Sequence, residues 1–557
     1  MRVPFSLFLF TFALLIRVIG LRWGLPSAAH WYSYHPDESP RQIVGAVAGI
    51  LSSGDFNPHF FNYPSLYIYL TSFAYLLMSM LGLTTTAASS APWPVLQDIT
   101  LAGRLVTALL GAATVPVVYL IGREIRGHRL GLAAALLMAL LPGHVQHSHF
   151  ATVDVPATFF VALSLYFAVR ALRPRDENSP SWSNKQLCIA AGMAGLAAAT
   201  KYNGGVVIVA PIFSWFLLAR RGLIISRASF ALLPAMAVLG FLIGCPYSVL
   251  SFGEFWGDCK INGVCYELMV HPRLGSGEIF KDTGNGWWYH LSFNLPFMMT
   301  WPLLIATLIG LAMAVLQRTR WRWSTAISGD GAVWLPLLAW SALYCVTLGL
   351  SQVRFMRYTL PLMPAFCVFA AGGVMMLRDA AGSTAGARRF RIPAAFALCG
   401  ALGIAALMGT ATVLLPFVAT DPRDAAAQFL RAQQKTPTTV GLISPPWFWT
   451  PPLSLRDAPP GTGSVVTESP DGRYKFAVTG FDTTKLQSAQ PQWFIISEYE
   501  WMEKERLRDA EYEKFMDVLH RQYSLAASFP ASGAGKSEYE PHDFLYTHPV
   551  IRIYRRG

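Results

Sequence analysis

The stretch Tyr34-His35-Pro36-Asp37-Glu38 follows the first apolar run of the chain, Val3 to Leu21. A run of about 20 apolar residues has the length of a membrane-spanning helix. An ionised carboxylate beside hydrocarbon is costly unless a partner or a substrate uses it. The acidic pair Asp37 and Glu38 is therefore interpreted as functional. The alternative is that Asp37 only caps the amphipathic segment 39–51, a role that Asp often fills.

The composition is that of an integral membrane protein. Of the 557 residues, 53% are hydrophobic and only 14% are charged, whereas soluble domains carry about 25% charged residues. The net charge of +12 does not indicate a nucleic-acid partner, because the arginine clusters lie between apolar runs, as in cytoplasmic loops of membrane proteins. The first run has no small-residue cleavage site before the acidic pair, so we interpret it as a retained anchor rather than a signal peptide.

Further apolar runs predict about eleven membrane crossings, counting the first. These runs are 99–121, 130–141, 155–172, 187–199, 206–219, 228–245, 295–316, 333–350, 358–377 and 393–418. The run Pro64–Leu83 decides the orientation. If it crossed, the cluster Arg123, Arg126 and Arg129 would be external. As a helix lying on the outer surface, it leaves every arginine-rich loop in the cytoplasm. The other such loops contain Arg173, Arg175, Arg220, Arg221, Arg318–Arg322 and Arg388–Arg391.

The polar residues that could take part in catalysis or binding then share one side of the membrane. The first external loop, 23–97, holds the acidic pair and two amphipathic helices. The other external segments are 144–154, 201–203, 246–294, 351–357 and the tail after Thr420. We therefore predict a plasma (inner) membrane protein whose active site and C-terminal domain are extracytoplasmic.

Two further motifs lie at the ends of predicted helices. Asp154 stands in HSHFATVDVPATFF, where it could act in catalysis, cap a helix that has Pro156 in its first turn, or do both. Lys201 and Tyr202 stand in AATKYNGG, between two short apolar runs. A lysine at this depth can hold a phosphate as a point charge, or it can be an ordinary snorkelling lysine.

Arg354, Arg357 and Tyr358 stand in SQVRFMRYTLPLMP on the predicted outer side. External arginines oppose the general charge bias, so an anionic partner is expected. The alternative is a salt bridge to a loop carboxylate. Arg104 is expected to neutralise Asp37 or Asp154. Tyr63 starts the surface helix in FNYPSLYIYL, where aromatic residues also form interfacial belts.

The sequence gives only weak indications of a metal cofactor. His147 and His149, with His144 nearby and His271 or His290 elsewhere, are weak candidates for a divalent metal site, because their spacing is not that of a known ligand set. The seven cysteines contain no CxxC pattern. Cys259 and Cys265 share a predicted external loop, where a disulfide is chemically allowed.

The composition changes after Asp421 to that of a soluble domain, which predicts domains 1–420 and 421–557. Helices are expected over 423–434 and 503–523, and strands over 439–443, 474–478, 493–497 and 550–554. A small α/β domain on the outer face fits this pattern. No nucleophile constellation or phosphate loop stands in it, so we expect it to shape acceptor access or bind an external partner.

In order, these motifs resemble the GT-C superfamily of membrane glycosyltransferases over 5–418, nearest to bacterial relatives of protein O-mannosyltransferases and lipid A aminoarabinose transferases (glycosyltransferase family 39/83-like). The resemblance includes NYPSLYIYL, the pattern from Arg104 through GREIRGHRLG to ATVDVP, TKYN, and the Arg-Tyr-Leu-Pro-Pro pattern from Arg357. The chain departs from the aminoarabinose branch in reading NYP rather than Lys-Pro-Pro, and in two arginines before Tyr358 where that branch tends to have lysine. Donor sugar and acceptor therefore stay open.

The resemblance implies inverting transfer of a sugar from a polyprenyl-phosphate donor to a lipid, glycan or protein acceptor. It implies Asp37 as the catalytic carboxylate with Glu38 as its neighbour, Asp154 as a second acidic residue, and Lys201 and Arg357 as phosphate ligands. Independently, a sugar phosphodiester has a good leaving group, so an enzyme needs only a base and cations to balance the departing phosphate. The rival interpretations are a lipid or sugar transporter or flippase, which usually carries ionisable groups near the bilayer midplane, and a non-catalytic protein that binds lipid-linked sugar.

Overall fold

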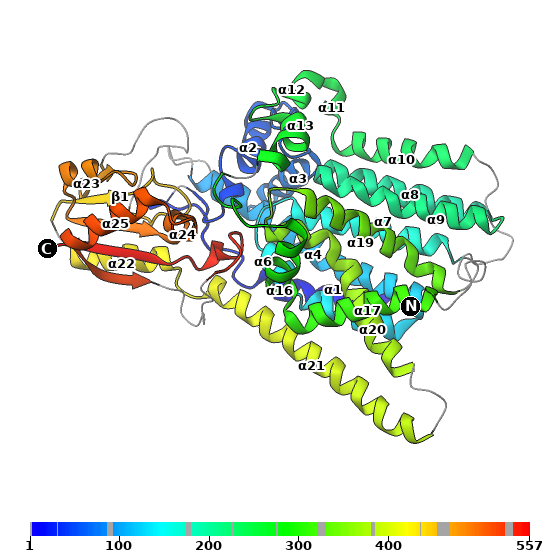
Figure 1. Cartoon of the computed structure of the whole chain (residues 1–557). Coiled ribbons are helices and arrows are strands. Elements are labelled where there is room, and N and C mark those ends of the chain that lie inside the picture. The colour runs from blue at the N-terminus through cyan, green and yellow to red at the C-terminus, as the bar shows by residue number, and fades with distance from the viewer. Residues whose placement is uncertain are drawn as a thin grey trace.

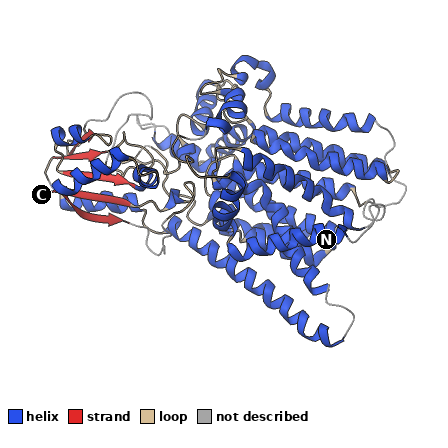
Figure 2. Ribbon diagram, viewed as in Figure 1, coloured by secondary structure: helices blue, strands red, loops and turns tan. Residues whose placement is uncertain are grey.

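Long apolar helices form the larger part of the molecule, and a five-stranded sheet with its covering helices forms the smaller part (Figures 1 and 2). The computed structural model describes residues 3–30, 32–85, 93–173, 180–223, 228–274, 277–319, 330–379, 385–434, 436–453, 468–469, 471–529 and 539–557. Of the arginines predicted to face the cytoplasm, Arg175, Arg320 and Arg322 lie outside these residues.

The bundle is built of helices that lie roughly side by side, with the C-terminal ends of α9 and α20 at the end far from the sheet (Figure 1). Its long helices are α1 (Val3–Val18), α4 (Trp93–Arg126), α5 (His128–Ala139), α7 (Asp154–Ala171), α8 (Pro180–Thr200), α9 (Val209–Arg220), α10 (Ala228–Gly244), α17 (Trp301–Thr319), α19 (Leu335–Leu350), α20 (Met363–Asp379) and α21 (Ala385–Val418). One apolar core runs through them, with small residues such as Ala134 and Ala194 where helices approach closely.

Among the described residues, six helices are long and apolar enough to span a membrane, and one bent pair raises this number to seven. Four more apolar helices are shorter: Phe5–Val18, Leu66–Met80, His128–Ala139 and Ala228–Gly244. The molecule is therefore a polytopic helical protein, and the count of eleven crossings stays a prediction. The expectation of one continuous crossing over 295–316 is wrong, because the chain turns by 118° between Gly286–Met299 and Trp301–Val315.

Short elements cover the end of the bundle that faces the sheet. After α1 come the 3-10 turn η1 (Pro36–Glu38), α2 (Ile43–Ser53) and α3 (Leu66–Met80). The helix α3 has 15 residues, and its place on the outer surface stays a prediction. The others at this end are α6 (Pro142–His147), η2 (Tyr202–Ile208), α11 (Tyr247–Leu250), α12 (Phe252–Trp256), α13 (Gly263–Cys265), η3 (Tyr266–Val270), α14 (His271–Leu274), α15 (Gly286–Tyr289), η4 (His290–Asn294), α16 (Leu295–Met299) and η6 (Met356–Leu362), whereas η5 (Asp330–Trp334) leads into α19.

The C-terminal part is a mixed sheet in the order β2-β1-β3-β5-β4. The strands β1 (Thr438–Leu442), β2 (Tyr474–Val478) and β3 (Trp493–Ser497) are parallel, and β5 (Ile551–Arg556) runs antiparallel to both β3 and β4 (Tyr523–Phe529). Its helices are α22 (Pro422–Gln433), α23 (Thr483–Ala489), α24 (Glu498–Arg506), α25 (Ala510–Gln522) and the turn η7 (Leu545–Thr547). The four predicted strands and the helix after Asp421 agree with this structure.

Two features of the C-terminal part differ from the prediction. The single helix expected over 503–523 is two helices, separated at Arg508, whose φ is 51°. The strand β4 was not predicted. Asp509 explains the break, because its side chain accepts hydrogen bonds from Glu511 N and Tyr512 N and so caps a new helix.

A buried arginine joins the two parts of the molecule. Arg423 in α22 pairs with Asp421 at 2.7 Å and donates to the carbonyl oxygens of Phe448 and Tyr546. Asp421 in turn accepts from the Trp23 indole at 3.1 Å. These contacts set the sheet domain against the end of the bundle, where the first loop emerges.

Candidate active site

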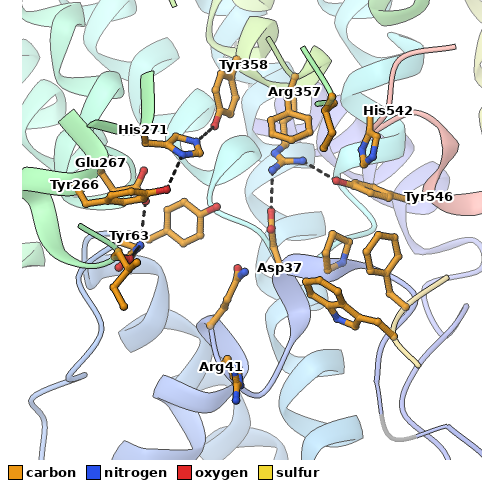
Figure 3. Close-up of a pocket in the computed structure, with 18 of the residues that line it drawn as sticks. Asp37, Arg41, Tyr63, Tyr266, Glu267, His271, Arg357, Tyr358, His542 and Tyr546 are labelled. Carbon is orange, nitrogen blue, oxygen red and sulfur yellow. Dashed lines mark hydrogen bonds and ion pairs between the residues drawn. The ribbon is translucent and has the colours of Figure 1, made fainter. Parts of the chain in front are cut away.

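Asp37 lies in η1, directly after the first helix, and its carboxylate points into a cavity of about 850 Å³ (Figure 3). His35 fixes this turn by accepting a hydrogen bond from Asp37 N through Nδ1 at 3.2 Å. The alternative that Asp37 caps the next helix is wrong, because α2 begins at Ile43 with Gln42 as its cap residue.

Glu38 faces away from this cavity and is held by Arg104. Arg104 Nε and NH2 donate to the two carboxylate oxygens at 2.8 and 2.7 Å, and both side chains are fully buried. Glu38 also accepts from Ala151 N at 2.6 Å. Arg104 thus neutralises Glu38 rather than Asp37 or Asp154, and the pair fixes the loop that carries Asp37.

Arg357 lies at the centre of the site. Its NH2 is 3.2 Å from Asp37 Oδ2, and its Nε is 3.8 Å from Asp154 Oδ2. Arg357 thus forms the salt bridge to a loop carboxylate that was expected as the alternative to an anionic ligand, and its role as a phosphate ligand stays a prediction. The other Asp37 oxygen has no hydrogen-bond partner among the described residues, so one acceptor atom of this carboxylate stays open to the cavity.

Lys201 and Asp154 form a tight pair next to Arg357. Lys201 Nζ donates to Asp154 Oδ1 at 2.6 Å and lies 4.1 Å from the centre of the Tyr358 ring. Lys201 therefore does not snorkel. Asp154 is the first residue of α7, where a carboxylate also favours the helix terminus. Because Lys201 neutralises Asp154, more of the positive charge of Arg357 acts on the cavity.

The C-terminal domain supplies one wall of the site. Both oxygens of Asp543 accept backbone hydrogen bonds, from Met356 N at 2.9 Å and Arg357 N at 2.8 Å. Tyr546 accepts from Arg357 NH1 at 3.0 Å (Figure 3). The sequence did not indicate these residues, because nothing local in the tail marks a contact with the segment around Arg357. The cavity is further lined by aromatic residues of this domain: Trp447, Phe448, Trp449 and Tyr499.

The opposite wall comes from the loop between α1 and α4 and from the segment after α13. Tyr63 lies between Asp37 and this wall, as Figure 3 shows. Tyr266 OH and Tyr358 OH lie 3.4 and 3.5 Å from the two ring nitrogens of His271. Glu267 completes the wall. Tyr266 and Glu267 were also missed by sequence reasoning.

Burial raises the pKa of Asp37 above its usual value of 3.8, against the opposing attraction of Arg357. Burial likewise raises the pKa of Glu267, to about 7, and lowers the pKa of His271 to about 4. A carboxylate with a raised pKa in a cavity is a typical candidate for a general base.

Two predicted binding residues lie outside the cavity. Arg354 donates to Thr283 Oγ1 at 2.7 Å and to the Gly284 carbonyl at 2.8 Å. It holds the loop around Thr283 through neutral atoms and forms no ion pair among the described residues, so the alternative of a salt bridge is not found and an anionic ligand stays a prediction. Tyr202 donates to the Phe61 carbonyl at 2.8 Å and supports the loop before α3.

The candidate metal ligands are dispersed. Both ring nitrogens of His149 lie at backbone carbonyl oxygens, those of Val145 and Ile19, at 2.8 and 2.9 Å. His147 Nε2 lies 3.8 Å from Asp543, and His271 stands in the other wall. Within the described part of the chain, no group of three His, Cys, Asp or Glu has an arrangement that could hold a metal ion. The interpretation of these histidines as one metal site is therefore corrected.

The chain is similar to known proteins in part of its sequence and in its fold. A family model described as dolichyl-phosphate-mannose-protein mannosyltransferase matches residues 94–247, which include Asp154 and Lys201. The structure of ArnT from Cupriavidus metallidurans bound to undecaprenyl phosphate matches with a TM-score of 0.50 and 14% identity, over 99% of this chain and 98% of that chain. The chain has the GT-C fold.

Two more structures show the same GT-C fold. ArnT from the same organism in the apo state has a TM-score of 0.50 and 17% identity, over 99% of this chain and 98% of that one. The apo Archaeoglobus fulgidus oligosaccharyltransferase has a TM-score of 0.50 and 14% identity, over 97% and 76%. No curated protein sequence matches the chain. The sequence resemblance to the GT-C superfamily is thus confirmed at the level of the fold.

Proposed function

We propose that the chain transfers a sugar from a polyprenyl-phosphate donor to a hydroxyl acceptor on the extracytoplasmic face of the membrane, with inversion at the anomeric carbon. Asp37 is the general base and Arg357 the main phosphate ligand. The observation that carries the proposal is the open Asp37 oxygen beside Arg357 in a cavity built on the GT-C fold.

The reaction balances without an added acid. The acceptor oxygen attacks the anomeric carbon, and the bond from that carbon to the phosphate oxygen breaks with its electron pair. The polyprenyl phosphate leaves as an anion, and the acceptor proton moves to Asp37. Arg357 offsets the charge on the departing phosphate, and Lys201 contributes from behind Tyr358, because electrostatic stabilisation acts strongly in a buried site.

A polyprenyl carrier fits the position of the cavity. The site lies where the helical bundle ends and the sheet domain begins (Figure 1). The similar ArnT structure holds undecaprenyl phosphate. At this position the headgroup can reach Arg357 while its tail stays in hydrocarbon, and an acceptor can arrive from the other side. Of the eleven crossings that we propose, the shorter apolar helices α1, α5 and α10, together with α8, supply those that length and composition alone do not establish, and α3 is the surface helix.

The same position speaks against the transporter interpretation. Transporters generally place their substrate and ion sites near the bilayer midplane between repeated halves. Here the cavity is lined by the first loop, residues 261–271 and 279, the segment 355–358 and the sheet domain. A non-catalytic relative would share this architecture, so turnover has to distinguish it from an enzyme.

The test is Asp37→Asn in the full chain, reconstituted in bilayers with a panel of polyprenyl-phosphate sugars. Loss of a general base lowers turnover by about 10²–10⁴-fold, while binding of sugar-free polyprenyl phosphate should persist because Arg357 remains. Asp55→Asn is the matched control, since Asp55 is an exposed carboxylate of the same loop. Wild-type turnover by the Asp37→Asn protein would remove Asp37 from the chemistry.

A further inference from the structure

The cavity has two chemically different sides (Figure 3). Arg357 and Tyr546 lie on one side, and Tyr266, Glu267 and His271 lie on the other. Asp37 lies between them. The proposed reaction uses the Arg357 side for phosphate and Asp37 for the proton. It gives no role to the carboxyl group of Glu267.

Glu267 is a carboxyl group with few partners. Its Oε1 accepts one hydrogen bond, from Asn62 Nδ2 at 3.2 Å. Among the described residues it forms no ion pair, and no hydrogen bond reaches its second oxygen. Glu267 is half-buried, and this burial raises its pKa to about 7 although Lys201 lowers it, so its ionised form carries a desolvation cost. A residue kept at such cost in a cavity is a candidate for ligand binding.

The surrounding chain holds Glu267 rigidly. Asn62 is its hydrogen-bond donor and also fixes the preceding loop, because Asn62 donates to the Ile261 carbonyl at 3.2 Å and accepts from Gly263 N at 3.3 Å. The disulfide Cys259–Cys265 closes the same loop two residues before Glu267. Precise placement of a few polar groups is what a small-molecule site requires.

We propose that Glu267, held in place by Asn62, binds a ring hydroxyl group of the sugar that is transferred, opposite the phosphate-binding Arg357. This inference rests on the proposed function. A carboxylate accepts hydrogen bonds from hydroxyl groups, and the second oxygen of Glu267 has no hydrogen-bond donor among the described residues, so this oxygen suits a sugar hydroxyl. With its phosphate at Arg357 and its anomeric carbon within reach of the acceptor near Asp37, the sugar ring extends toward the wall that carries Glu267.

Glu267→Gln tests the proposal, because it keeps the shape of the side chain and its hydrogen bond with Asn62 but replaces one acceptor oxygen by a donor. Its effect is measured with a donor series in which one ring hydroxyl at a time is removed or inverted. We expect the KM for the best donor to rise about tenfold or more, as for one lost hydrogen bond to a charged group. The wild type should reject one deoxy donor, and the variant should lose that discrimination.

Two controls separate recognition from folding. Glu254→Gln changes an exposed carboxylate of the same external segment that pairs with His59, and it should keep wild-type discrimination. Sugar-free polyprenyl phosphate, measured by titration calorimetry, should bind wild type and Glu267→Gln equally.

Unchanged donor discrimination in Glu267→Gln would overturn the sugar subsite and leave the proposed transferase function standing. An equal loss of binding for sugar-free polyprenyl phosphate would also overturn it, because Glu267 would then only support the fold. Absence of transfer by the wild type with every donor would overturn both proposals.

Discussion

Asp37 and Glu38 are neighbours in sequence, yet the structure gives them opposite surroundings. Glu38 is closed off by Arg104 and the Ala151 amide, so it cannot reach a substrate. Asp37 keeps one oxygen open to the cavity. The sequence indicates that an acidic pair after the first helix is unusual, but which of the two is buried against an arginine depends on the rotation of a three-residue turn. Only the packed structure determines that rotation.

The pKa of Asp37 predicts how activity depends on pH. A base must be deprotonated to act, and burial raises the pKa of Asp37 above 3.8. As pH falls through this raised pKa, the fraction of active enzyme falls about tenfold per pH unit. We expect kcat/KM to show this acid limb at a higher pH than an ordinary Asp would give. A pH profile on a single donor measures it.

The Arg357 cation lowers the pKa of Asp37 against the effect of burial. Arg357→Gln should therefore move the acid limb of the residual activity further upward. The pH profile of the residual activity of the Asp37→Asn protein should lack this acid limb. The assignment of this limb to Asp37 is wrong if the Asp37→Asn protein retains it at the same pH.

At the scale of elements, two helices were predicted as continuous but are broken, and at each break the sequence contains a residue that indicates it. The run 295–316 reads as one apolar helix, but Thr300 has a φ of 70° and the chain bends there. Pro302 marks the start of a new helix, since proline is favoured in a first turn and disfavours helix before it. The break near Arg508 likewise follows from the capping Asp509. The prediction relied on the length of apolar runs and on the pattern of charges, and it gave these single residues too little weight.

Asp543 anchors the element that carries Arg357, and its contribution can be measured. Asp543→Asn leaves one acceptor oxygen for the two backbone amides of Met356 and Arg357, and turns an amide group toward one of them. An unsatisfied buried amide costs about 1–3 kcal/mol. We expect kcat/KM for the donor to fall about tenfold, because Arg357 shifts from Asp37.

The exposed Asp517 in α25 provides the matched control, and Asp517→Asn should leave donor kinetics unchanged. A thermal unfolding curve for both variants shows whether the Asp543 effect is local. If Asp543→Asn turns over at the wild-type rate, the C-terminal domain does not position Arg357.

At the scale of the molecule, the C-terminal domain belongs to the site itself. The sequence predicts its strands and first helix, and we expected it to shape acceptor access. The structure instead brings Asp543 and Tyr546 onto Arg357 across 186 and 189 residues of sequence. Contacts of this range leave no local pattern. Removing the domain should therefore impair use of the donor as well as choice of the acceptor.

The orientation of the whole molecule is the last prediction. The arginine-rich loops, such as the one after α9, lie at the end of the bundle far from the sheet domain (Figure 1), and such loops stay in the cytoplasm. Arg220→Cys, at the end of α9, should react with a membrane-impermeant maleimide only after permeabilisation. Lys485→Cys, exposed in α23, should react in intact cells. Both are made with Cys399→Ser, because Cys399 is exposed. The reverse labelling would put Asp37 and Arg357 on the cytoplasmic side and rule out extracytoplasmic transfer.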